Sequence, residues 1–177
     1  MLDRLHRMLS ALFALGAGAS MAGLFLIILL NALRRYFLGR SWSWGEQLPV
    51  FIAIYGVMFG VALACLQDRH ISFAVLRDLL GERLRRALAI VSELVIALCG
   101  AMLVRSALLL IDSRGAREAS GIVGAAKSLA RQTGQDWIAA LGTQAPWQFA
   151  LVIGGVAIAL AGALQAARRI RDFGAEV

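Results

Sequence analysis

Two charged residues inside a long apolar stretch are the first candidates for chemistry in this sequence. Glu93 and Arg105 are the only charged residues between Ala87 and Ile111, a stretch long enough to cross a membrane as a helix. An ionisable residue within a membrane span is by default a candidate functional site. A lone carboxylate can relay protons or cations, but it can also serve packing or contact water at the membrane boundary. The sequence leaves these roles of Glu93 open.

The spacing of the two residues argues against an ion pair within their own helix. Arg105 follows Glu93 by twelve residues, which corresponds to about 18 Å along a helix and about 120° around it. Glu93 is six residues into the stretch and is therefore expected near a membrane boundary. Small residues that can pack against another helix share its face: Ala97, Gly100 and Val104. Arg105 is also expected off the centre of the stretch, with its side chain reaching outward toward Asp112.

Residues typical of catalytic, haem and metal sites do not gather in the apolar stretches. His6 and His70, the two histidines, lie outside them, whereas a membrane haem anchor needs axial ligands within its helices. Cys65 and Cys99 match no metal or redox motif and are expected to be small buried residues. HExxH, GxSxG and phosphate-binding glycine motifs are absent from the sequence. We therefore predict no catalytic residue, no cofactor and no metal, and a protein that is not an enzyme.

The composition indicates that most of the chain faces lipid or protein rather than water. Of its 177 residues, 60% are hydrophobic and 16% are charged, whereas soluble domains carry about 25% charged residues. Four apolar stretches have the length of a membrane span: residues 8–33, 48–66, 87–111 and 145–167. The sequence therefore predicts an all-α membrane protein with four transmembrane helices in a single domain, residues 1–177. The first stretch exceeds the apolar core of a signal peptide, so we expect it to remain as a helix.

The connections between the predicted spans differ in character. Two tryptophans typical of the membrane interface lie between the first two spans: Trp42 and Trp44. From Ser72 to Arg86, apolar residues recur at three- and four-residue steps, which predicts an amphipathic helix lying in the interface. The third connection, residues 112–144, is the longest and most polar. We expect it to be weakly helical over residues 125–141, with a break at Gly134.

The distribution of lysine and arginine predicts the orientation in the membrane. If the N-terminus is cytoplasmic, the cytoplasmic segments hold ten basic residues and the outer segments hold seven, four of them in the third connection. A long connection can cross a membrane regardless of its charge, and discounting it leaves ten against three. We therefore expect both termini in the cytoplasm. Because the net charge of +7 arises mainly between the apolar stretches, it reflects topology and not nucleic-acid binding.

Small residues recur at helical spacing in two further spans. They are Gly56, Gly60 and Ala64 in the second span, and Gly155, Ala159 and Gly162 in the fourth. Such seams let helices approach closely in lipid. They are equally compatible with packing among the four helices and with docking to a larger membrane subunit.

Three short motifs surround the second predicted span. In chain order they are Arg35-Tyr36 after the first span, Trp44-Gly45-Glu46-Gln47 at the start of the second, and Arg69-His70-Ile71 at its end. Together with four spans in a chain of this length, they resemble the small membrane subunit of tripartite ATP-independent periplasmic (TRAP) transporters. In that family the second motif ends in two glutamates, and Gln47 replaces the second one here. The resemblance covers residues 31–71.

The resemblance implies a division of labour between three proteins. In the family, a periplasmic solute-binding protein captures an organic anion, and a large membrane subunit carries it with an ion gradient across the bacterial inner membrane. The small subunit braces the large one. The implied partners of this chain are the large subunit, the binding protein through the complex, and phospholipid. Candidate residues for contact with a subunit or with lipid are Arg35, Tyr36, Trp44, Glu46, Gly56, Gly60, Arg69, His70 and Glu93.

Glu46 and His70 have further roles that their positions suggest. Glu46 can complement the dipole at the start of the second helix, with one of the arginines between the first two spans as its partner, or it can be a solvated interfacial charge. His70, beside Arg69, can bind a lipid phosphate or the large subunit, or it can be an ordinary interfacial histidine.

Two other functions remain open. One is a self-contained four-helix transporter with Glu93 as its coupling carboxylate, although such chains are shorter and carry their essential glutamate in the first helix. The other is a structural anchor for a different membrane complex, such as a respiratory enzyme. Genes for a large permease and a secreted binding protein beside this one would favour the TRAP interpretation.

Overall fold

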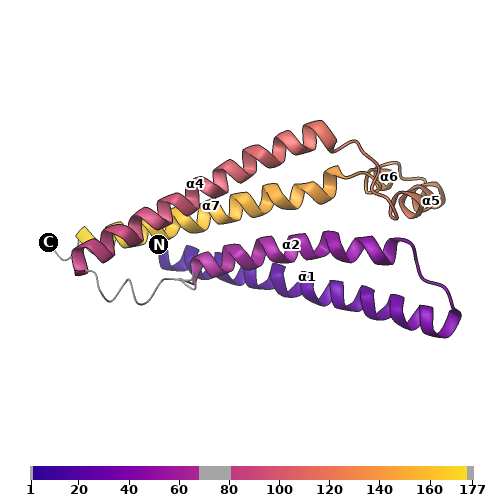
Figure 1. The fold of residues 1–177 in the computed structure, drawn as a ribbon, viewed down its shortest axis with the longest axis horizontal. Coiled ribbons are helices and arrows are strands. Elements are labelled where there is room, and N and C mark those ends of the chain that lie inside the picture. The colour runs from indigo at the N-terminus through magenta and orange to yellow at the C-terminus, as the bar shows by residue number, and fades with distance from the viewer. Residues whose placement is uncertain (1, 68–80, 175–177) are drawn as a thin grey trace.

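The computed structural model describes residues 2–67 and 81–174, and no strand is present in these ranges. Four long helices lie side by side and make up most of the molecule: α1 (Leu2–Leu38), α2 (Trp44–Leu66), α4 (Glu82–Arg114) and α7 (Ala145–Gly174) (Figure 1). Each is long and apolar enough to cross a membrane, and each contains one of the predicted spans. The prediction of an all-α membrane protein with four membrane-crossing helices is confirmed.

The four long helices form a row in which each contacts its neighbours. α1 packs against α2, α2 against α7, and α7 against α4, so that α1 and α4 form the two edges. The central helix is α7, since 56% of its most apolar window is buried, against 11% for α4 and 6% for α1. Both termini lie at one end, which we call the terminal end (Figure 1). The opposite end is the cap end.

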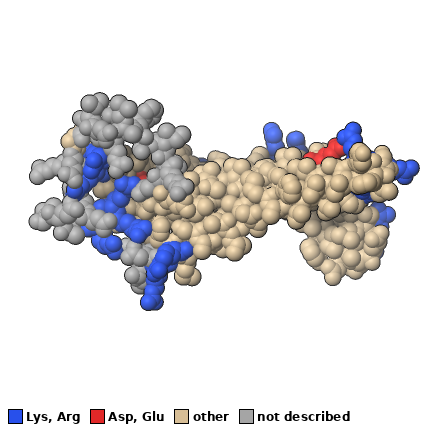
Figure 2. Space-filling view, turned by 90° about the horizontal axis from the view of Figure 1, so that it is seen from below, with Lys and Arg blue, Asp and Glu red and all other residues tan. Residues whose placement is uncertain are grey.

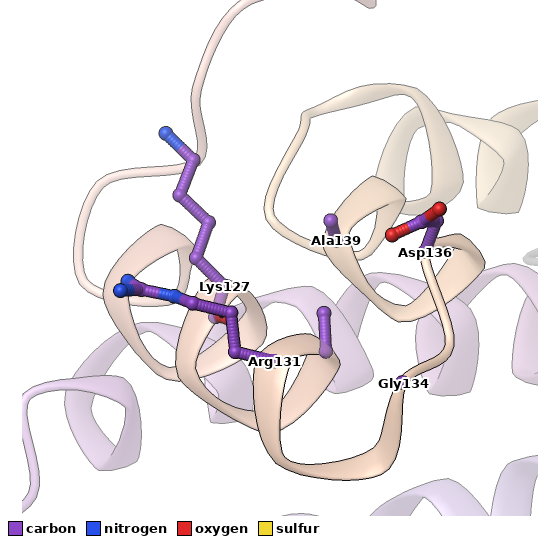
Figure 3. A pocket seen from close by; sticks show the side chains of 6 residues that line it. Lys127, Arg131, Gly134, Asp136 and Ala139 are labelled. Carbon is purple, nitrogen blue, oxygen red and sulfur yellow. The ribbon is translucent and has the colours of Figure 1, made fainter.

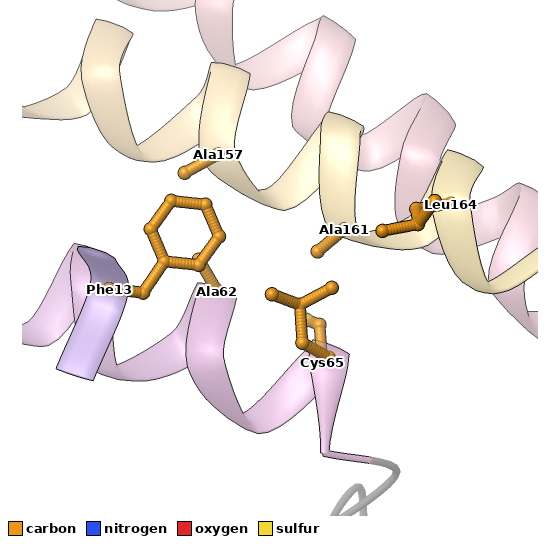
Figure 4. Packing of buried hydrophobic residues seen from close by; sticks show 7 residues of the cluster. Phe13, Ala62, Cys65, Ala157, Ala161 and Leu164 are labelled. Atoms are coloured by element: carbon orange, nitrogen blue, oxygen red, sulfur yellow. The ribbon is translucent and has the colours of Figure 1, made fainter. Parts of the chain in front are cut away.

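A hydrophobic cluster joins three helices toward the terminal end. Its buried members are Phe13 of α1, Ala62, Cys65 and Leu66 of α2, and Ala157, Ala161 and Leu164 of α7 (Figure 4). Its alanines let the helix backbones approach closely, and close packing of this kind holds helices together in lipid. Cys65 is buried as predicted. Cys99 is exposed on α4, contrary to expectation, because it lies on the side of α4 that α7 does not cover.

α2 and α7 run parallel, and their contacts define a register from end to end. Near the cap end, the Phe51 ring stacks on Trp147 with 5.1 Å between centroids. The Tyr55 hydroxyl donates a hydrogen bond to the Pro146 carbonyl (2.6 Å). Farther along, Gly154 of α7 lies against the Met58 side chain. This register sets the depth of the polar residues on all the neighbouring helices.

The connection between α4 and α7, residues 115–144, folds into a cap that holds α5 (Val123–Thr133) and α6 (Trp137–Ala140). Three backbone hydrogen bonds close its base: Ala119 N–H to Gly142 O (2.7 Å), Gln144 N–H to Arg117 O (2.9 Å) and Ala145 N–H to Gly115 O (3.0 Å). Gly134 follows α5 with a φ of 68°, a conformation that favours glycine. The predicted weak helix with a break at Gly134 is confirmed.

The cap rests on the start of α2. The Ser120 hydroxyl donates to Gln47 Oε1 (3.4 Å). Gly121 has a φ of 83°, and a Cβ added there would lie 3.0 Å from the Ser43 carbonyl oxygen. Gln47, which replaces the second glutamate of the family motif, therefore contacts the cap.

The predicted interfacial helix, residues 72–86, falls mostly outside the described residues. Its last residues, from Glu82 onward, form the start of α4. The helix that crosses the membrane therefore begins earlier than the predicted third span. Arg69 and His70 also lie outside the described residues.

Candidate functional site

A backbone carbonyl at the terminal end of α2 joins three helices. The Leu66 oxygen accepts one hydrogen bond from His6 Nε2–H of α1 and another from Gln165 Nε2–H of α7, each 2.9 Å long. Carbonyls in the last turn of a helix have no partner within it, so the two neighbouring helices satisfy this group. Neither donor was singled out from the sequence. The available signal was that Gln165 is one of only two glutamines in the apolar stretch of residues 145–167.

Glu93 lies on the inner face of α4, buried against α7. Only 4% of the residue is exposed, and its Oε1 is 3.4 Å from Nη2 of Arg169 on α7. The Arg169 side chain is 34% exposed, so the pair lies at the border between the helix interior and the surroundings. This placement contradicts the interpretation of Glu93 as a solvated interfacial charge and agrees with the packing interpretation. The sequence does not reveal the proximity of Arg169 to this carboxylate.

The small residues of α4 and α7 face one another. A Cβ added to Gly100 would lie 2.5 Å from the Ala159 nitrogen, and one added to Gly155 would lie 2.8 Å from Val104 Cγ2. Gly162 meets α4 in the same way. The two helix backbones therefore touch, with no room for a larger side chain between them. The two predicted seams pack against each other inside the chain.

The predicted seam of α2 is used only in part. Gly56 faces α1, where an added Cβ would lie 3.0 Å from the Ser20 Cβ. Gly60 has open space beside it, with no described atom within 4 Å of an added Cβ. Of the two candidate interface glycines, Gly56 packs within the chain and Gly60 remains accessible to lipid or to a partner.

An arginine of α1, a tryptophan of the α1–α2 connection and the tryptophan at the start of α2 form a stack. The Arg34 guanidinium lies 4.2 Å from the centre of the Trp42 ring, and Trp42 stacks on Trp44 with 5.1 Å between centroids. The backbone N–H of Trp42 donates to Oδ1 of Asn31 (2.8 Å), a polar residue that is buried. A Cβ on Gly45 would lie only 2.7 Å from Asn31 Cγ, so glycine permits this approach. These contacts stabilise the turn into α2.

Three other predicted residues at this turn are exposed. Tyr36 is 84% exposed, and its ring meets Phe37 edge-on. Arg35 lies beside it in the last turn of α1. Glu46 occupies the first turn of α2, as its predicted role at the helix dipole requires. Within the described ranges Glu46 forms no ion pair, and Arg34 lies over a tryptophan instead.

A shallow hollow on the cap lies between α5 and α6. Its volume is about 450 Å³, and it is lined by Lys127, Ala130, Arg131, Gly134, Asp136 and Ala139. The two basic side chains point away from Asp136 (Figure 3), and Lys127 pairs with Glu118 at 2.7 Å. The charged groups therefore do not converge on a ligand. In the described part of the chain, moreover, no group of three or more His, Cys, Asp and Glu side chains is placed to hold a metal ion.

Charged residues concentrate at the two ends of the molecule. On the face shown in Figure 2, lysine and arginine side chains gather at the terminal end and again toward the cap end. A broad band between them shows only uncharged side chains (Figure 2). This distribution is typical of a protein whose middle lies in hydrocarbon and whose ends meet headgroups and water.

Comparison with protein families agrees with the motifs around α2. The family model of the DctQ component of tripartite ATP-independent periplasmic transporters matches residues 24–172. Comparison with curated proteins gives no significant match. The family consists of transporter components and not of enzymes, and its members work with the other two components of an inner-membrane transporter. Because the match runs from α1 through α2, α4 and the cap into α7, the chain belongs to the DctQ component family of TRAP transporters.

Proposed function

We propose that this chain is the small scaffold subunit of a binding-protein-dependent secondary transporter. It braces the large membrane subunit during uptake of an organic anion driven by an ion gradient. The observation that carries the proposal is the close packing of α4 against α7. The facing backbones of α4 and α7 touch at Gly100 and Gly155, and buried Glu93 contacts Arg169. A transport site near the midplane typically needs broken helices with free backbone groups, whereas these helices serve packing.

The Glu93–Arg169 contact weighs against a self-contained transporter that uses Glu93. A coupling carboxylate must exchange its ion with both sides of the membrane, whereas Glu93 is 4% exposed. Arg169 lies one helical turn beyond Gln165, which contacts Leu66 at the end of α2. The pair therefore lies at the terminal end of the bundle and not in its middle. No specific observation favours an anchor for another complex.

The proposed orientation follows the basic residues, with both termini in the cytoplasm and the cap in the periplasm. The cap then faces the compartment of the solute-binding protein. Ser41 and Ser120 are both exposed, and both belong to connections on the cap side. Cysteines introduced at these positions, in a chain lacking Cys65 and Cys99, should react with a membrane-impermeant thiol reagent added from the periplasm. Reaction only from the cytoplasm would reverse the orientation.

Phospholipid contacts are proposed at both ends of the bundle. Exposed Tyr36 and the stacked Trp42 and Trp44 suit the aromatic belt at one interface. Arg69 and His70, which follow α2, remain candidates for a lipid phosphate or for the large subunit at the other.

Reconstitution tests the scaffold proposal. Vesicles that contain only this chain should show no uptake driven by sodium or protons, since a brace has no transport site of its own. Cells that lack the chain should lose uptake or accumulate less of the large subunit. Saturable, gradient-driven uptake by this chain alone would contradict the proposal.

A further inference from the structure

The outer face of α4 carries an arginine among large apolar side chains. Gly100 and Val104 face α7, so residues on the opposite side of the helix point away from the bundle. We call this outer surface the Arg105 face, and it comprises Leu98, Met102, Arg105 and Leu109. All four side chains are exposed, the three apolar ones by about 60% of their area (60, 62 and 61%). Nothing in the described chain covers this face.

Contacts between the helices show the level of Arg105 along the length of the bundle. Its chain neighbour Val104 lies against Gly155 of α7, and the adjacent Gly154 lies against Met58 of α2. Met58 is fourteen residues from the first residue of α2 and eight from the last. These separations correspond to about 21 and 12 Å along the helix, within a hydrocarbon core about 30 Å thick. Arg105 therefore lies at the level of a residue well inside α2, about 12 Å from the nearer end of that helix.

The described part of the chain supplies no counter-charge at this depth. Over residues 2–67 and 81–174, Arg105 forms no hydrogen bond and no ion pair. Glu93 lies on the other face of α4, against Arg169. Asp112 follows two helical turns later, about 10 Å along the axis. To reach the headgroups from this level, the arginine side chain has to extend along the helix or the bilayer has to thin locally.

α1, which forms the opposite edge of the row, carries no charge in its apolar part. α1 is even less buried than α4, yet no residue from Met8 to Leu33 is charged. Lipid tails can cover such a helix without desolvating a charge. An ionised residue within a span, by contrast, almost always faces protein or a water-filled cavity and pairs with a partner there. The α4 edge is therefore the one that requires a protein neighbour.

We propose that the Arg105 face docks against the large membrane subunit and that a carboxylate of that subunit pairs with Arg105 inside the membrane. The inference rests on the proposed function, which supplies the large partner, and it specifies the helix and the chemistry of the contact. The surrounding apolar side chains pack against the partner and exclude water, which strengthens the ion pair. The pair also fixes the register, because any other alignment leaves a charge unpaired in the membrane.

Photo-crosslinking in the assembled complex tests the docking face. A benzoylphenylalanine probe replaces Met102 on the Arg105 face, and a matched probe replaces Phe25 on α1; both residues are 62% exposed. After irradiation, mass spectrometry should find the Met102 probe attached to the large subunit and the Phe25 probe attached to phospholipid. Adducts of Met102 with phospholipid alone, or adducts of the large subunit only with Phe25, would overturn the proposal.

Substitutions test the ion pair. Arg105→Leu should lower the amount of large subunit that copurifies by at least about tenfold, because it leaves the partner's carboxylate unpaired. Arg105→Lys keeps the charge and should retain most of the complex. Arg114→Leu, the same change at the exposed end of α4, is the control and should leave copurification unchanged. If the Arg105→Leu variant and the unchanged chain copurified equal amounts of the large subunit, the proposed ion pair of Arg105 would be wrong.

Failure of the docking face and failure of the proposed function give different results. If the unchanged chain does not copurify with a large subunit, both fail. If it does copurify, while the Met102 probe labels only lipid and Arg105→Leu has no effect, the scaffold function survives and the docking face is wrong.

Discussion

The two charged residues within the apolar part of α4 show that opposite faces of one helix serve different purposes. Glu93 lies on the face that packs against α7, where it is buried and contacts Arg169. Arg105 lies on the other face, exposed among leucine and methionine side chains. The first charge has its partner within the chain, and the second requires one from outside. Direction around the helix thus separates residues that stabilise the subunit from residues that build the assembly.

Removing the Glu93 carboxylate should have the largest effect on the isolated subunit. Glu93→Ala leaves the partly buried Arg169 without this carboxylate. We expect a loss of about 2–3 kcal/mol, below the 3–5 kcal/mol typical of fully buried pairs, because the Arg169 side chain is 34% exposed. This loss is measured as the change in the free energy of unfolding in mixed micelles.

Glu93→Gln is the matched control, because it keeps the shape and one hydrogen-bond acceptor. It should cost less stability than Glu93→Ala and leave uptake by the assembled transporter intact. Loss of uptake with normal assembly would show that the carboxylate takes part in transport, and the scaffold proposal would then be wrong.

The contact between the small residues of α4 and α7 should tolerate no added methyl group. In Gly100→Ala the new Cβ would lie 2.5 Å from the Ala159 nitrogen, a backbone atom that cannot move independently. Overpacking of this kind costs about 1–3 kcal/mol. Gly60→Ala, where an added Cβ meets no described atom, should change the unfolding free energy by less than about 0.5 kcal/mol. Equal effects of the two changes would show that α4 and α7 are not closely packed.

Removing one donor to the shared acceptor, the Leu66 carbonyl oxygen, should have a smaller effect on the free energy of unfolding. Gln165→Ala removes one of its two donors, and we expect a loss of about 1 kcal/mol. His6→Ala should cost a similar amount. The double variant should lose more than the sum of the two, since it leaves a carbonyl without any partner from the neighbouring helices. Strict additivity of the two losses would argue against a shared acceptor.

The features that depend on local composition could be predicted from the sequence. The four spans follow from their apolar lengths, and the break at Gly134 follows from the conformational freedom of glycine. Packing of the small-residue seams within the chain was one of two possibilities left open, because helical spacing reveals a face but not the surface that it contacts.

The polar contacts could not be predicted, because they join residues far apart in the chain. Glu93 and Arg169 are separated by 76 residues, and Gln165 and Leu66 by 99. The level of Arg105 relative to the neighbouring helices could not be predicted for a related reason. An apolar stretch shows where a helix can lie in a membrane, but its level relative to Met58 and Gly154 depends on packing.

The smallest effect on the isolated subunit is expected from Arg105→Leu, and its sign should be opposite to that of Glu93→Ala. The change removes no contact within the described chain, and it relieves the cost of placing a guanidinium in an apolar environment. That cost is about 2.5–3.5 kcal/mol at a helix centre, but displacement of the flexible side chain recovers most of it. The unfolding free energy in micelles should therefore stay unchanged or rise by up to about 1 kcal/mol. If Arg105→Leu instead destabilised the isolated subunit as much as Glu93→Ala, Arg105 would serve the fold of the subunit, and the two faces of α4 would not differ in purpose.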